Sequence, residues 1–496
     1  MKQKITINKE NIIGKVERNV WGSFIEMMGR VVYGGIYQPN HPTADKEGFR
    51  GDVIEAVKEL NVPIIRYPGG NMLSGYDWRD GIGKNRPVRL ELAWGEIEPN
   101  AMGIHEFCSW SDKVGSEVMM CINMGTGSPR GAAELVEYCN HPSGTTLSDL
   151  RIKNGAKEPF KIKKWCIGNE MDGHWQICGL KADEYGRKAY ETAKIMKYVD
   201  RDIELIVCGS ADRASHPSWD RTTLEYTYDL VDYISVHSYF SYTQNGKMFD
   251  FLSCHSNLDE YLKGFVATAD YVKALRRSKK KMMLSVDEWN IWHMKPSVVC
   301  KNTYDDQYVD RWTIGPRRVE NIYDFADALA FSGLICTLIN HADRVKMGCL
   351  AQLINVIAPI MTNDETVLKQ TLYYPYLLAN KYAKGDALNL RISCPIIETE
   401  NGDSGEVCGA CTKDGNEYCL WMINKTNAWQ NYDVIFEVDD VALTERIEMC
   451  SELHSFNDFS HPDDVGLRKI PVNSKKANTF SVRLPAYSLT LFRFTE

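Results

Sequence analysis

The chain of 496 residues is 44% apolar and 25% charged, which is typical of a soluble globular enzyme and long enough for a large barrel with an accessory module. Its formal net charge of −8 argues against nucleic acids and anionic membranes as partners, because both attract basic surfaces. The sequence contains no apolar run long enough to span a membrane.

The N-terminal residues alternate like a strand and lack the apolar stretch of a signal peptide. The 15 cysteines are an odd number, and four of them lie in apolar segments where buried strands are expected: Cys121, Cys166, Cys208 and Cys336. These features predict reduced, buried thiols in a cytoplasmic protein. Cys408 and Cys411 have metal-knuckle spacing, but no second pair follows at a suitable distance, so we expect no metal and no cofactor.

Eight strand-like runs alternate with helical patterns between residues 19 and 382. The runs are 21–26, 62–67, 118–123, 165–168, 205–208, 233–237, 283–286 and 345–350. Near-continuous apolar strands separated by helices, such as those over residues 52–60 and 182–198, indicate a parallel sheet buried on both faces. Eight such units predict a (β/α)8 TIM barrel, and no strand–GxGxxG–helix unit supports a dinucleotide-binding fold.

The pattern changes at the end of this region. Short alternating runs at 418–423, 432–438 and 480–492 are separated by Asn, Gly, Asp and Lys clusters. They predict a C-terminal antiparallel β-sandwich, jelly-roll-like in form, over residues 383–496. We expect the strand within residues 1–18 to join this sandwich, which leaves residues 19–382 as the catalytic barrel.

Polar residues concentrate at the carboxyl ends of the predicted barrel strands, which open on the face where barrel active sites lie. These residues are Glu26, Arg66, Asn169, Glu170, His237, Tyr239, Asp287 and Glu288, with Asn71 in the turn after the second strand. Burying two unpaired carboxylates for structure alone is costly. Glu170 and Glu288 are therefore the predicted pair of carboxyl groups for glycoside hydrolysis.

Several of these residues also have structural explanations. Arg66 can form a buried ion pair, His237 can be a core histidine, and Asn71 can be a turn residue after two glycines. The residues alone leave open which glutamate is the nucleophile and which the acid/base. No metalloprotease, serine-nucleophile or P-loop motif offers a competing chemistry.

The neighbours of the two glutamates have possible roles in such a site. Asn169 is a candidate for a hydrogen bond to the sugar 2-hydroxyl, a contact that strengthens in the transition state. Tyr239 can donate a hydrogen bond to the nucleophile, and Trp292 can supply an apolar wall.

Seven segments together resemble the glycoside hydrolase family 51 α-L-arabinofuranosidases, and the likeness runs through essentially the whole chain. They are 29–37, 66–71, 78–83, 165–173, 287–292, 351–360 and 484–488. The resemblance implies a barrel with catalytic glutamates on strands four and seven, retention of configuration, Glu170 as acid/base and Glu288 as nucleophile. It also implies that the furanose is gripped by Glu26, Asn71, Asn169, Tyr239 and Gln352, with Trp292 near the substrate.

The same resemblance implies a metal-independent, cytoplasmic and often hexameric enzyme whose partners are arabinofuranose-containing oligosaccharides. Three places depart from the family pattern: His174, the stretch 124–129, and His293 with Met294. All are expected in loops near the rim, where they bear on linkage preference and leaving-group contacts.

We therefore predict a retaining, exo-acting α-L-arabinofuranosidase that removes terminal residues from arabinan- or arabinoxylan-derived oligosaccharides. The alternative is another retaining barrel glycosidase, a β-xylosidase or an endoglucanase, which a panel of aryl glycosides distinguishes. A third reading is a sugar-binding protein without catalysis, which would bind such oligosaccharides and leave them intact.

Overall fold

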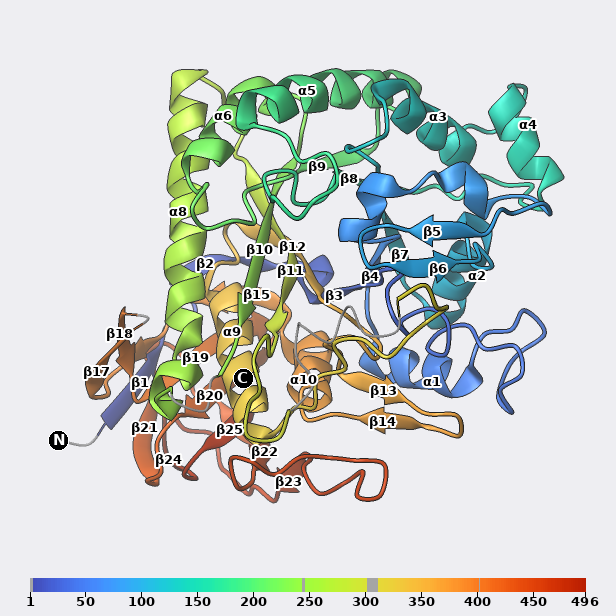
Figure 1. Cartoon of the computed structure of the whole chain (residues 1–496). Helices are drawn as coiled ribbons and strands as arrows, with labels where there is room; N and C mark the ends of the chain where they lie inside the picture. Colours follow the sequence, from blue (N-terminus) through green and yellow to red (C-terminus); the bar gives the residue numbers. More distant parts are fainter. Residues whose placement is uncertain (1–2, 243–245, 301–310, 401) are drawn as a thin grey trace.

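A closed barrel of eight parallel strands forms the centre of the computed structural model, which describes residues 3–242, 246–300, 311–400 and 402–496 (Figure 1). The strands close in the order β10-β11-β12-β3-β4-β7-β8-β9. Their bounds are β3 (Gly22–Phe24), β4 (Ile64–Tyr67), β7 (Glu117–Cys121), β8 (Lys164–Ile167), β9 (Glu204–Val207), β10 (Tyr233–Phe240), β11 (Met283–Ile291) and β12 (Val345–Leu350). Each predicted run overlaps one of these strands, so the predicted barrel is confirmed.

Helices cover the outside of the barrel, and α5, α6 and α8 are the most prominent in Figure 1. Their bounds are α1 (Gly51–Leu60), α2 (Ile104–Val114), α3 (Pro129–Asn140), α4 (Thr146–Lys153), α5 (Ala182–Val199), α6 (Ser218–Thr227), α7 (Met248–Leu252), α8 (Cys254–Leu275), α9 (Phe325–Asn340) and α10 (Tyr373–Tyr382). The helix α1 buries the apolar face that its periodicity predicts. It ends where Asn61 adopts a left-handed conformation, with φ of 55°, and donates its N–H to the last turn.

The helix α9 corrects one sequence expectation. Cys336 was expected in a buried strand, but it lies in this helix, whose residues from Phe325 to Ile339 are all buried. The helix contacts β11 on the barrel side and the strands β19, β20 and β25 on the other side. A helix that is packed on all sides is apolar on all sides, and its sequence then has the continuous hydrophobicity of a buried strand.

Two sheets form the sandwich, which lies below α8 and α9 in Figure 1. One has the order β16-β1-β21-β24, made of β16 (Arg391–Ile392), β1 (Gln3–Ile7), β21 (Gln430–Phe436) and β24 (Thr479–Leu484). The other has the order β2-β15-β19-β20-β25-β22-β23, made of β2 (Ile12–Val16), β15 (Gly385–Leu388), β19 (Val407–Asp414), β20 (Glu417–Asn424), β25 (Ser488–Thr495), β22 (Ala442–Cys450) and β23 (Arg468–Ile470). All strand pairs in the two sheets of the sandwich are antiparallel except β1 with β21, which is parallel.

Three two-stranded hairpins lie outside these sheets. They are β5 (Arg89–Glu91) with β6 (Glu96–Glu98), β13 (Ile360–Thr362) with β14 (Val367–Lys369), and β17 (Ile396–Thr399) with β18 (Gly402–Gly405). The first of them reaches the functional site described below.

Buried thiols fill part of the barrel interior. Cys121, Cys166 and Cys349 belong to one apolar cluster that also contains Phe24 and Ile206. All 15 cysteines are free, as expected, and most are buried, whereas Cys178 is exposed. Burial raises the pKa of the Cys166 and Cys349 thiols, which keeps them protonated. Within the described ranges, no helix combines the length and hydrophobicity needed to cross a membrane.

Candidate active site

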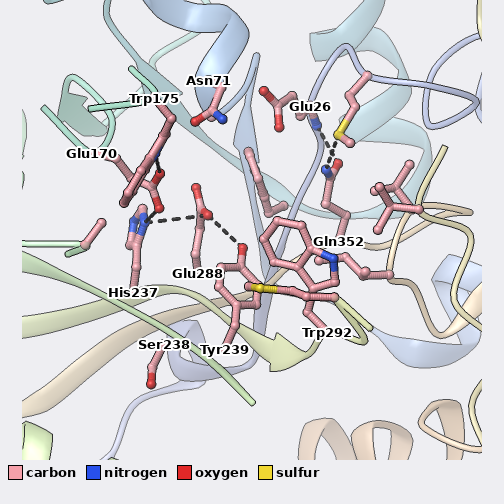
Figure 2. Close-up of a pocket in the computed structure, with 18 of the residues that line it drawn as sticks. Glu26, Asn71, Glu170, Trp175, His237, Ser238, Tyr239, Glu288, Trp292 and Gln352 are labelled. Carbon is pink, nitrogen blue, oxygen red and sulfur yellow. Dashed lines mark hydrogen bonds and ion pairs between the residues drawn. The ribbon is translucent and has the colours of Figure 1, made fainter. Parts of the chain in front are cut away.

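A cavity of about 480 Å³ opens at the carboxyl ends of the barrel strands, where the sequence predicts the site (Figure 2). The sequence predicts eight residues that act in catalysis or contact the sugar. Seven of them line this cavity: Glu26, Asn71, Glu170, Tyr239, Glu288, Trp292 and Gln352. Its size is within the ordinary range for a small-molecule site. The structure thus brings together residues that are up to 326 positions apart in the chain.

A strained turn presents Glu170 to this cavity. The strand β8 ends at Ile167, and both Gly168 (φ 95°) and Glu170 (φ 43°) adopt the left-handed region. That conformation is unfavourable for a glutamate and is characteristic of residues held in place at functional sites. The carboxylate accepts hydrogen bonds from Trp175 Nε1 at 2.6 Å and pairs with His237 Nδ1 at 2.8 Å.

A β-bulge places Asp287 and Glu288 on the same side of β11. The register with β10 runs from the pair Ser235–Ser285 to the pair His237–Glu288, so β11 contains one extra residue there. Consecutive residues of a regular strand point to opposite faces, but a bulge removes that alternation. Both carboxylates consequently reach Arg66, at 3.5 Å for Asp287 and 2.6 Å for Glu288.

Glu288 differs from its sequence-based placement in one respect. It lies inside β11, which continues to Ile291, and not directly after the strand. Beyond the ion pair with Arg66, it accepts a hydrogen bond from Tyr239 Oη at 2.7 Å. Arg66 therefore forms the buried ion pair with a carboxylate that its structural explanation predicts.

His237 lies between three carboxylates. Its Nδ1 is 2.8 Å from Glu170 and 3.5 Å from Glu288, and its Nε2 is 3.6 Å from Asp287. Burial alone lowers the pKa of a histidine, but here the charge of Glu288 and the contacts with Asp287 and Glu170 raise it to about 10. His237 is therefore a cation at neutral pH.

The two glutamates respond differently to this cation. Burial acts to raise the pKa of Glu170, but the hydrogen bond and charge of His237, together with the hydrogen bond from Trp175, bring it below its ordinary value. Burial raises the pKa of Glu288 above its ordinary value, against the charges of His237 and Arg66. His237 Nδ1 and the Glu170 carboxylate are 2.8 Å apart, which is a distance at which a proton can pass between them.

The opposite part of the cavity is formed by residues that follow β3, β4 and β12. Glu26 is held by Trp94 Nε1 at 2.9 Å and by the backbone N–H of Met72 at 3.1 Å. Its own N–H donates to Gln352 Oε1 at 2.9 Å. Burial raises the pKa of Glu26 to about 8, so its carboxyl group is protonated at neutral pH and able to donate a hydrogen bond.

Asn169 is the one predicted site residue that does not line the cavity. Its side chain is buried, with Oδ1 accepting from Arg66 Nη2 at 2.7 Å and Nδ2 lying 3.5 Å from Asn71 Oδ1. It therefore connects the arginine below the site to Asn71, which does reach the cavity.

Trp94, Trp175 and Arg213 are among the lining residues that the sequence did not predict. Trp94 lies in the turn of the β5–β6 hairpin, far in sequence from any barrel strand. Trp175 is five positions after Glu170, and its place in that short loop is a signal that could have identified it. Of the departures from the family pattern, His174 and Met294 line the cavity, whereas His293 is buried against Asp327.

Two family models match the sequence. Residues 56–261 match the α-L-arabinofuranosidase 1 domain, and residues 287–488 match the α-L-arabinofuranosidase C-terminal domain. An intracellular exo-α-(1→5)-L-arabinofuranosidase of Acetivibrio thermocellus is 49% identical over 86% of this chain and 85% of its own length. One of the same description from Bacillus subtilis is 50% identical over 79% of this chain and 78% of its own length.

The fold has a solved counterpart of the same size. A family 51 α-L-arabinofuranosidase from Bifidobacterium longum superposes with a TM-score of 0.93 and 35% sequence identity, covering all of both chains. The similarity therefore extends over the barrel and the sandwich together.

Proposed function

Because this chain belongs to the family 51 α-L-arabinofuranosidases, we infer that it is an exo-acting enzyme that hydrolyses terminal, non-reducing α-L-arabinofuranosyl residues. Its substrates are arabinofuranose-containing oligosaccharides derived from arabinan or arabinoxylan. The observation that best supports this function at the level of the site is the pairing of Glu170 and Glu288 across one cavity, with Glu26, Asn71 and Gln352 on its other side.

We propose a double displacement. One Oε of Glu288 attacks the anomeric carbon of the bound arabinofuranosyl unit, and the bond from that carbon to the leaving oxygen breaks. Glu170 gives its proton to the leaving oxygen in the same step. Glu170 then takes a proton from water, whose oxygen attacks the anomeric carbon and releases arabinose and the Glu288 carboxylate.

The proton that Glu170 delivers is the one that it shares with His237. In the free enzyme this proton lies mainly on the imidazole, which is 2.8 Å from the Glu170 carboxylate. Movement across that hydrogen bond converts a carboxylate beside an imidazolium into a carboxylic acid beside a neutral imidazole. Arg66 and Tyr239 meanwhile favour the ionised form of Glu288 that is needed for attack.

The spacing of the carboxylates supports retention of configuration. One oxygen of Glu170, one oxygen of Glu288 and one ring nitrogen of His237 all lie within 4.8 Å of one another. Retaining enzymes hold their carboxyl groups about 5–5.5 Å apart, whereas inverting enzymes leave about 6.5–9.5 Å for a water molecule. Glu26, Asn71, Tyr239 and Gln352 are proposed to grip the furanose, and Asn169 is proposed to hold Asn71 in place behind them. Trp292 is the proposed apolar wall, and it meets the Tyr239 ring edge-on.

Methanol tests the stereochemistry directly. With an aryl α-L-arabinofuranoside as donor, the glycosyl-enzyme intermediate should transfer arabinose to methanol and form the methyl α-L-arabinofuranoside, identified by NMR of the product. The methyl β-anomer would contradict double displacement. Failure to cleave any arabinofuranoside, with cleavage of xylosides or glucosides in the same aryl panel, would instead favour the β-xylosidase or endoglucanase alternative, which the curated relatives do not support.

The shared proton predicts the alkaline limb of the pH–rate profile. Wild-type kcat/KM should stay high until the pH approaches the raised pKa of His237, about 10, and fall above it. In the His237→Gln variant, Glu170 must hold the proton alone, so the alkaline limb should move to lower pH by about 2 units or more, and kcat should also fall. The measurement is kcat/KM for an arabino-oligosaccharide from pH 4 to pH 10.5.

The His237 imidazole also makes the stability of the folded protein depend on pH. Its pKa in the folded protein lies above the ordinary value of 6.5, so the protonated imidazole stabilises the fold fully below that value. This contribution to stability is lost as the pH rises to about 10.

An alkaline limb of kcat/KM that stays in place in His237→Gln would contradict the shared proton. Melting temperatures across the pH range serve as the control for unfolding.

Location and assembly are further proposals. Two similar proteins are intracellular enzymes, and together with the 15 free cysteines they support a cytoplasmic protein. A homo-oligomer, a hexamer by family resemblance, is supported by three apolar side chains that are exposed together near the β5–β6 hairpin: Val88 (66%), Leu90 (58%) and Leu92 (64%). Light scattering coupled to size exclusion measures the number of subunits.

A further inference from the structure

A second cavity adjoins the active site. It has a volume of about 350 Å³ and shares Arg213 and Tyr239 with the first cavity. We call it the side hollow, and its characteristic residues are Arg213, Tyr242, Lys247, Phe251, Asn257 and Glu400. The volume is sufficient for a small ligand of its own.

The side hollow lies on the side of the site from which the leaving group departs. The strands β12, β3 and β4, which precede Gln352, Glu26 and Asn71, are consecutive in the barrel. The strands β8, β9 and β10 are consecutive in the opposite part of the barrel, and Glu170 follows β8 while Arg213 follows β9. Because Glu170 protonates the leaving oxygen, the rest of an oligosaccharide must extend over this second group of strands.

Arg213 is held at the boundary between the two cavities. Its Nη2 donates to Ser238 Oγ at 2.8 Å, and its guanidinium lies 3.8 Å from the centre of the Tyr261 ring. Burial lowers the pKa of Arg213 from its ordinary value, but the group remains a cation. A guanidinium fixed in this way presents its remaining donors to a ligand without much loss of conformational entropy.

The chemistry of the side hollow suits a neutral sugar. Tyr242 and Phe251 form an aromatic pair with ring centres 5.4 Å apart, which offers an apolar surface to a sugar ring. Ser241, Lys247, Asn257 and Glu400 supply both donors and acceptors, and within the described part of the chain none of these side chains has a hydrogen bond or ion pair. Sugar hydroxyls donate and accept, so they match such a mixed set better than a single charged group does.

We propose that the side hollow binds the third and later sugar units of a neutral arabino-oligosaccharide, counted from the terminal arabinose that is cleaved off. This proposal rests on the proposed function, and it adds a preference for chain length that the catalytic residues do not provide. Hydrogen bonds from Arg213, Lys247 and Asn257 hold the third unit of the chain. A trisaccharide then gains transition-state binding that a disaccharide cannot reach.

The test compares substrates of increasing length on wild type and matched variants. The ratio of kcat/KM for α-(1→5)-arabinotriose to that for arabinobiose should be about 10 in the wild type, the effect of one or two additional hydrogen bonds. It should fall to about 1 in Asn257→Ala and in Lys247→Ala. Glu260→Ala, an exposed position on the same helix α8 as Asn257, should keep the wild-type ratio and the wild-type rate on an aryl arabinofuranoside.

The outcomes separate this proposal from the proposed function. A ratio near 1 in the wild type, or a wild-type ratio in both Asn257→Ala and Lys247→Ala, overturns the side hollow while the aryl substrate is still cleaved. A gain seen only for oligosaccharides that carry a uronic acid also overturns it, in favour of an anion site made by Arg213 and Lys247. Absence of all arabinofuranosidase activity overturns the proposed function and this proposal with it.

Discussion

Glu288→Ala should lose on the order of 10⁴-fold or more of kcat on an aryl α-L-arabinofuranoside, because the covalent intermediate can no longer form. The substitution removes the carboxylate that accepts hydrogen bonds from Arg66 Nη1 at 2.6 Å and from Tyr239 Oη at 2.7 Å. It leaves His237, Glu170 and the residues around Glu26 in the cavity. The loss should therefore appear in kcat far more than in the affinity for a competing arabinoside.

Azide identifies the chemical reason for that loss. In Glu288→Ala the cavity left by the side chain admits azide, which attacks the anomeric carbon from the same face as the missing carboxylate. The product should be the inverted β-arabinofuranosyl azide, with partial recovery of the rate. Glu55→Ala, which removes an exposed carboxylate from the outside of the barrel, should behave as the wild type. Substantial activity of Glu288→Ala without azide would show that the nucleophile is another residue.

Much of this site could be predicted because the barrel has a simple sequence signal. Its strands are short and apolar, and the polar residues that follow them meet at one end. That rule alone located Glu26, Asn71, Glu170 and Glu288, which come from four different strands. The family resemblance was needed for Gln352 and for the order of the two glutamates.

The β5–β6 hairpin could not be predicted by the same rule, because its burial pattern is reversed. Leu90 and Leu92 are exposed, whereas Glu91, Glu96 and Glu98 are buried. The three carboxylates are stabilised by contacts from distant parts of the chain or from turns, such as Arg318 Nε to Glu96 at 2.6 Å and Trp94 N–H to Glu91 at 2.7 Å. The local hydrophobic periodicity of a sequence carries no information about such distant contacts. The position of Trp94 and its hydrogen bond to Glu26 could therefore not be predicted.

The bulge in β11 is a second feature that the sequence does not reveal. Asp287 and Glu288 are adjacent, and a regular strand would direct only one of them into the barrel. The extra residue between two pairs of the register turns both toward Arg66 and His237. The high pKa of His237 follows from this arrangement, since three carboxylates surround one imidazole.

Glu170→Ala should show a loss that depends on the leaving group. A dinitrophenyl arabinofuranoside departs as a stable anion and needs no proton, so its first step should slow by about tenfold or less. The second arabinose of arabinobiose must leave as an alcohol, so hydrolysis of arabinobiose should slow by about 10²- to 10⁴-fold, the usual contribution of a general acid. The measurement is kcat/KM on both substrates for the wild type, Glu170→Ala and the exterior control Glu55→Ala.

The two glutamate variants should also give azide products of opposite configuration. In Glu170→Ala the intermediate on Glu288 still forms, and azide attacks it from the face that the leaving group has vacated, which yields the retained α-arabinofuranosyl azide. With the dinitrophenyl substrate, the pH profile of kcat/KM for this variant should also lose its alkaline limb. The leaving group needs no proton, and His237 no longer has a Glu170 carboxylate to which it can pass one. Equal losses on both substrates, or the β-azide, would mean that Glu170 is not the acid/base. An α-azide from Glu170→Ala together with a β-azide from Glu288→Ala can arise only if the two carboxylates act from opposite faces of one anomeric carbon.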